Sequence, residues 1–81
     1  MTEIEWTRYS TTEWKGETGD EYEYEIRPLQ RQGARVFTAF FNLNKPPWHP
    51  ISVATEPGGA GVMSRLACRC QEHYDKLRNE S

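Results

Sequence analysis

The stretch Val36-Phe37-Thr38-Ala39-Phe40-Phe41-Asn42-Leu43 decides the fold class of this chain. Aromatic and β-branched residues favour the pleated backbone, and side chains two apart lie on the same face of a strand. One face is therefore expected to pack against the rest of the fold, and the other is expected to be left open. The expected inward set is Phe37, Ala39, Phe41 and Leu43. The expected outward set is Val36, Thr38, Phe40 and Asn42.

A second alternating run, Tyr22-Glu23-Tyr24-Glu25-Ile26, places two tyrosines and an isoleucine on one face and glutamates on the other. Thr18-Gly19-Asp20 before it has turn chemistry, which predicts a hairpin joining residues 14–17 to this strand. Gln30-Arg31-Gln32-Gly33 after it suits a second hairpin loop. Pro28 is expected to limit further pairing, because proline has no N–H to donate to a ladder.

The flanking segments are less regular. Residues 4–17 fit either one long irregular strand or two short strands with a bend near Ser10. Residues 51–55 alternate after a proline-rich segment and suit a short edge strand. A glycine-rich connector over residues 56–61 then leads into the last element.

The C-terminal segment predicts one amphipathic helix that ends near Arg78. Its apolar residues recur at helical spacing and form one stripe for burial. The stripe comprises Val62, Met63, Leu66, Ala67, Cys70, Tyr74 and Leu77. The expected fold is a single α+β domain over residues 1–81 in the order β-β-β-(β)-α. Its three- to four-stranded antiparallel sheet would carry the C-terminal α-helix on one face.

Composition and charge limit the class of protein. A chain of 81 residues with 36% hydrophobic and 27% charged residues supports one ordered domain of modest stability. Residues 1–26 hold eight acids and two bases, whereas residues 27–81 hold four acids and eight bases. This asymmetry indicates internal neutralisation, two surfaces of opposite sign, or simply a solvated acidic hairpin.

The chain is expected to be soluble and cytoplasmic. Glu3 and Glu5 stand where a signal peptide would be basic, and no apolar run is long enough for a membrane span. Cys68 and Cys70 are two apart in the predicted helix, so their side chains diverge and are expected to remain free thiols.

No motif predicts catalysis, a cofactor or a metal site. Cys70 and His73 are spaced to share one helix face, but Cys68 points away and a further ligand would have to come from His49. A buried Cys70 that acts as a small hydrophobic residue is the favoured interpretation. Nucleophile elbows, phosphate loops and dinucleotide fingerprints are absent, so we expect no enzyme.

The open face of the sheet is the predicted functional surface. An aromatic patch with an acidic margin on a flat face is typical of a surface that binds another protein. The expected contact residues are Val36, Phe40, Glu23, Glu25 and Trp48. The alternative is that Trp6 or Trp14 covers Phe40 within the same chain. The favoured function is therefore a non-catalytic accessory domain that binds another protein or a second copy of itself, as a homodimer.

Nucleic-acid binding is the alternative function. Three strands followed by a helix, with Phe37-Thr38-Ala39 in one strand and Gly59-x-Gly61 before Ser64-Arg65-x-Ala67, resemble the C-terminal part of a double-stranded-RNA-binding domain over about residues 20–78. The resemblance implies phosphate contacts at the start of the last helix, where Arg65 and Arg69 stand. The family's N-terminal helix is replaced by the strand-like residues 4–17, and the acidic second strand would repel a duplex.

Overall fold

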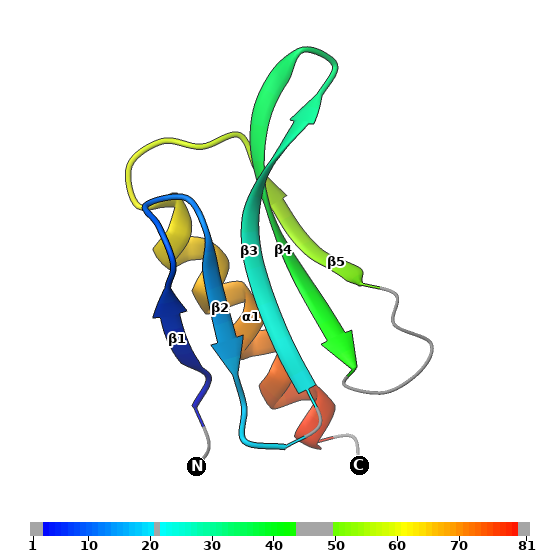
Figure 1. Ribbon diagram of the computed structural model, residues 1–81. Helices are drawn as coiled ribbons and strands as arrows, with labels where there is room; N and C mark the ends of the chain where they lie inside the picture. The colour runs from blue at the N-terminus through cyan, green and yellow to red at the C-terminus, as the bar shows by residue number, and fades with distance from the viewer. Residues whose placement is uncertain (1–2, 21, 44–49, 80–81) are drawn as a thin grey trace.

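The computed structural model describes residues 3–20, 22–43 and 50–79 and shows five antiparallel strands followed by one helix (Figure 1). The elements are β1 (Glu5–Arg8), β2 (Trp14–Glu17), β3 (Tyr22–Arg31), β4 (Ala34–Leu43), β5 (Ile51–Glu56) and α1 (Val62–Asn79). The strands lie side by side in chain order, and α1 packs across one face of the sheet. This confirms the α+β layout with a C-terminal helix.

The sheet has one strand more than the upper limit of the prediction, because residues 4–17 form two paired strands. The chain bends between β1 and β2 at Ser10, whose Oγ accepts hydrogen bonds of 3.1 Å from the N–H groups of Thr12 and Glu13. The backbone N–H of Tyr9 also donates to the carbonyl of Glu13, at 3.0 Å. These local bonds reverse the chain and set β1 against β2.

The β3–β4 hairpin is the longest paired unit of the sheet. Its pairing runs from Tyr22 opposite Leu43 to Arg31 opposite Ala34. Gln32 and Gly33 form the turn with positive φ angles of 51° and 78°, the combination required by a two-residue hairpin loop that matches strand twist.

The prediction that Pro28 limits pairing is wrong. Pro28 lies within β3, opposite Phe37 of β4. The pairing of β2 with β3 ends at Ile26, so at Pro28 no strand of the described chain borders β3 on its β2 side. The strand is an edge at this point, which is where prolines are tolerated in sheets.

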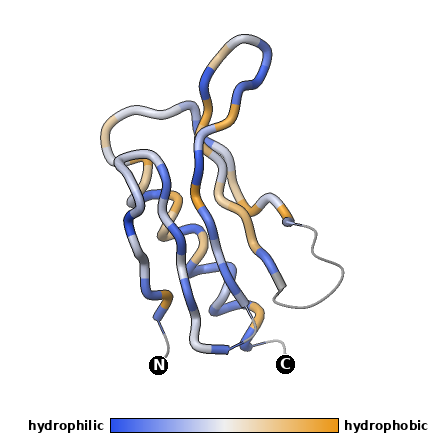
Figure 2. The backbone as a smooth tube through the Cα atoms, in the orientation of Figure 1, coloured by the Kyte–Doolittle hydropathy of each residue, from blue (hydrophilic) through white to orange (hydrophobic). Residues whose placement is uncertain are grey.

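The core lies between the sheet and α1. Its members are the inward residues of β3 and β4 and the buried stripe of the helix: Ile4, Tyr24, Ile26, Ala39, Phe41, Val62, Leu66, Cys70 and Tyr74. Met63, Ala67 and Leu77 are partly buried against this cluster, as the helical stripe predicts. Figure 2 shows frequent hydrophobic positions along β4, whereas hydrophilic positions are frequent along β3 and alternate with hydrophobic ones in α1.

The N-terminal hairpin extends this core with its tryptophans. Trp6 is opposite Gly16, and Gly16 is opposite the buried Tyr24, so Trp6 lies on the helix side of the sheet. Trp14 is opposite Ile26 and shares that side, with its ring 6.3 Å from the Trp6 ring. A Cβ on Gly16 would lie 2.5 Å from Ile4 Cγ2, so only glycine fits at this crossing.

Hydrogen bonds connect α1 to β3 and to residues next to the strands, at the edge of the core. Tyr24 Oη lies 2.8 Å from Nδ1 of His73, and Tyr74 Oη donates to Oδ2 of Asp20 at 2.7 Å. Gln71 Oε1 accepts the backbone N–H of Ile4 at 2.9 Å. The two tyrosine hydroxyls are therefore satisfied without breaking the apolar packing.

Candidate functional site: the open face of the sheet

The strand register assigns a set of side chains to the face of the sheet that α1 does not cover. On β3 and β4 these residues lie in directly opposed pairs, because residues opposite each other in an antiparallel ladder share a face. From one end to the other the pairs are Glu23 with Asn42, Glu25 with Phe40, Arg27 with Thr38, Leu29 with Val36, and Arg31 with Ala34. No helix or strand of the described chain lies over these residues.

Phe40 lies one pair away from the middle of this face and is only half-buried. The guanidinium carbon of Arg27 lies 4.8 Å from the centre of the Phe40 ring, a cation–π arrangement. Nε of Arg27 lies 3.3 Å from Oε1 of Glu25, without the geometry of a hydrogen bond. The three side chains form a surface cluster in which an aromatic ring is flanked by a paired positive and negative charge.

The hairpin end of the open face is apolar. Leu29 and Val36 are paired across the strands and half-buried. β2 pairs with β3 only as far as Ile26, and β5 pairs with β4 only as far as Phe37. Residues 29–36 therefore project as a two-stranded arm with no described strand on either side (Figure 1).

Three glutamates form a row at the opposite end of the open face. Glu5 lies directly opposite Glu17, and Glu17 lies directly opposite Glu23, on three consecutive strands. Like charges in directly opposed positions destabilise a sheet. The row makes this end of the open face acidic, with Lys15 of β2 as its neighbour on the same face.

Thr38 separates the two ends of the face. It is buried, with 2% of its surface exposed, because its neighbours on the sheet close around it. Its hydroxyl lies 3.2 Å from the hydroxyl of Thr55 on β5, so the buried oxygen has a partner. The middle of the face, between Phe40 and Val36, is therefore occupied by a small, buried side chain.

Four of the five predicted contact residues lie on the open face, in the arrangement that period-two alternation predicts: Val36, Phe40, Glu23 and Glu25. Trp48 lies outside the described residues. Trp6 and Trp14 pack on the opposite side of the sheet, so neither of them covers Phe40.

The prediction missed Arg27 and Leu29, which belong to the same face. Both were overlooked because the strand was expected to weaken at Pro28. Period-two counting continued through the proline would have found them. The glutamate row was missed for another reason: Glu5 and Glu17 become neighbours of Glu23 only when residues 4–17 form two strands in this register.

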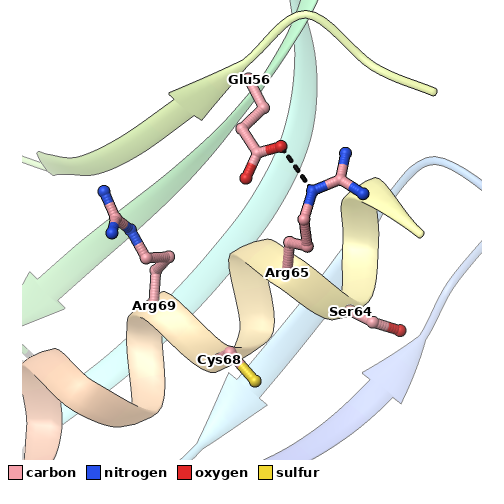
Figure 3. Close-up of a pocket in the computed structure, with 5 residues that line it drawn as sticks. All are labelled: Glu56, Ser64, Arg65, Cys68 and Arg69. Atoms are coloured by element: carbon pink, nitrogen blue, oxygen red, sulfur yellow. Dashed lines mark hydrogen bonds and ion pairs between the residues drawn. The ribbon is translucent and has the colours of Figure 1, made fainter. Parts of the chain in front are cut away.

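The alternative surface, at the start of α1, is a broad open hollow of about 500 Å³. Its lining residues are Glu56, Ser64, Arg65, Cys68 and Arg69 (Figure 3). Nε of Arg65 donates to Oε1 of Glu56 at 2.7 Å, and its Nη1 donates to the carbonyl of Ala60 at 2.6 Å. The charge of Arg65 is thus neutralised within the chain.

The cysteines and the described histidine do not form a reactive group. Cys68 is exposed, whereas burial of Cys70 raises the pKa of its thiol to about 12. Burial and the nearby Lys76 ammonium lower the pKa of His73, whose Nδ1 is engaged by Tyr24. Among residues 3–20, 22–43 and 50–79 no group of three metal-ligating side chains gathers, and His49 lies outside them.

Comparison of this chain with protein-family models, with curated proteins and with solved structures gave no match. The described part of the chain also contains no helix with the length and apolar character needed to span a bilayer.

Proposed function

We propose that the protein is a non-catalytic interaction module that binds another protein through the open face of its sheet. The observation that carries this proposal is the position of Phe40. This ring stands half-exposed near the middle of a face that α1 leaves bare, with Leu29 and Val36 beyond it and charged residues around it. Aromatic and aliphatic anchors within a polar rim are the usual composition of protein interfaces.

The proposed site of action is the cytoplasm. The free thiols of Cys68 and Cys70 are consistent with a reducing compartment. A catalytic function has less support, because within the described part of the chain no histidine or carboxylate is in hydrogen-bond contact with Ser64 or Cys68 to activate it. Arg65 and Arg69 give little support to nucleic-acid binding, since Arg65 already pairs with Glu56 and Arg69 is the one further base among the described residues that line the hollow.

A photo-reactive phenylalanine analogue at position 40 tests the proposal. The full chain would carry the analogue in cells of its source organism, and covalent adducts would be resolved by mass after irradiation. We expect a discrete protein adduct from position 40. The matched control carries the analogue at Glu72, which is exposed on α1, and should give none. Equal labelling from both positions, or no adduct from position 40, would contradict the proposal.

A further inference from the structure

We infer that the occupant of the open face is a second copy of this chain, seated antiparallel so that the arm of each copy lies over the glutamate row of the other. This inference rests on the proposed function and names its partner. It is carried by a self-complementary pattern on β3 and β4, by the charge distribution of the chain, and by the unsupported arm.

The pattern is symmetric about the pair Arg27 and Thr38. Successive pairs on one face are two residues apart, or about 7 Å along the strands. Glu23 and Arg31 are each four residues from Arg27, on either side of it. Suppose that the open faces of two copies meet and that a two-fold axis runs between them at this level, parallel to the sheets and perpendicular to the strands. This axis sets Glu23 of one copy against Arg31 of the other.

The same axis brings the apolar groups together. On β4, Phe40 and Val36 are each two residues from Thr38, so Phe40 of one copy meets Val36 of the second copy. Thr38 lies on the axis, where its small buried side chain permits close approach. One register thus sets Phe40 against Val36 and Glu23 against Arg31. It also sets Arg27 of one copy against Arg27 of the other, beside the Glu25 carboxylates that lie next to both of them, and it sets Glu25 opposite Leu29. Isologous contacts of this kind close into a dimer.

The charges of the chain favour this arrangement over a parallel one. Residues 26–55 contain no carboxylate, so the arm is positive, with Arg31 on its open face and Arg35 on its other face near the tip. The glutamate row lies at the other end of the same face. A parallel pairing would set arm against arm and glutamates against glutamates, which is unfavourable on both counts.

The arm also needs a neighbour. A two-stranded hairpin without a packed face has little stability of its own in water. Leu29 and Val36 stand on a part of the hairpin that neither β2 nor β5 borders. The second copy would cover this part with its Phe40 region, and Glu23, the β3 member of its glutamate row, would neutralise Arg31.

Charge exchange between two variants tests the pairing. Sedimentation equilibrium of the full chain at low salt should show a mass that rises from 9.5 kDa toward twice that value with concentration. Glu23→Arg alone and Arg31→Glu alone should each weaken association by about tenfold or more, since symmetry turns two attractions into two repulsions. An equimolar mixture of the two variants should associate like the wild type, because both contacts are then restored.

Controls separate this inference from the proposed function. Glu72→Arg and Arg69→Glu make the same charge changes on exposed positions of α1 and should leave association unchanged. Arg31 is exposed near the arm tip, so Arg31→Glu remains informative even if Glu23→Arg does not fold; circular dichroism would verify each fold. A wild type that stays at 9.5 kDa, or a mixture that fails to associate, overturns the pairing. An adduct of position 40 with a different protein would then still uphold the proposed function.

Discussion

The helix-covered face and the open face belong to one sheet but differ in how their polar groups are paired. On the covered face, the hydroxyls of Tyr24 and Tyr74 each have a partner at less than 3 Å, and the surrounding side chains are almost wholly buried. On the open face, Glu5, Glu17 and Glu23 stand next to one another. The contrast indicates that the covered face supplies the stability of the domain, whereas the open face carries a charge pattern that stability alone does not require.

The largest difference between the faces is expected for truncation of buried and open aliphatic residues. Leu66 is fully buried between α1 and the sheet, so Leu66→Ala should lower the free energy of unfolding by about 2–5 kcal/mol. Val36→Ala on the arm should cost less than about 1 kcal/mol in dilute solution, because much of that side chain stays in water. Urea unfolding measures both, and equal losses would contradict the assignment of stability to one face.

A smaller loss is expected from crowding the covered face at Gly16. The added methyl of Gly16→Ala would meet Ile4 Cγ2 and the Trp6 ring at 2.5 and 2.9 Å. Overpacking of this kind costs about 1–3 kcal/mol. The neighbouring Lys15→Ala, whose side chain is on the open face, should change stability by no more than about 0.5 kcal/mol. Thermal melting of the two variants would compare the faces at adjacent positions.

The pH dependence of stability should also come from the covered face. Burial and the Lys76 ammonium lower the pKa of His73, so the unfolded chain binds a proton more readily than the folded chain. Stability is then complete above the ordinary value of 6.5 and is lost as pH falls below it toward the folded pKa. Urea midpoints between pH 7 and pH 5 should therefore decrease. The His73→Gln variant should show a flatter profile, and an unchanged slope would exclude His73 as the cause.

A second acid-sensitive contact titrates at lower pH. Desolvation opposes ionisation of Asp20, but hydrogen bonds from Thr18, Tyr74 and the Tyr22 backbone outweigh it and lower the pKa of this carboxyl. The stability from this contact is complete above the ordinary aspartate pKa and declines as pH falls through the folded value. Asp20→Asn should therefore remove part of the loss below about pH 4. Its profile above pH 5 should match the wild type.

The smallest change in stability is expected on the open face, and it is a gain rather than a loss. Glu17 lies between Glu5 and Glu23, so Glu17→Gln removes two like-charge contacts. We expect the dilute protein to gain about 0.2–0.5 kcal/mol of stability at low salt. The gain should shrink when salt screens the charges. A loss of stability would show that the row is already compensated within the chain.

Periodicity predicts most of the covered face. The alternation of β3 and β4 and the helical stripe of α1 identify the core correctly, since burial on one face is what these periods encode. Periodicity does not specify the pairing of β1 with β2, which depends on hydrogen bonds to Ser10 Oγ. The glutamate row follows from that register, so it could not be predicted from spacing along the chain. The extension of β3 through Pro28 depends on β2 ending early, which is also a tertiary feature.

The most direct test of the account is the solvent exposure of three methyl groups, measured by NMR with a soluble paramagnetic probe at low and high protein concentration. The Ile26 methyl signals should never broaden, because the residue is buried, and those of Ile51, which is 54% exposed on β5, should always broaden. The account predicts that Val36 broadens in dilute solution and becomes protected as the concentration rises. Protection of Val36 at every concentration would contradict an open face, and exposure at every concentration would contradict its pairing with a second copy.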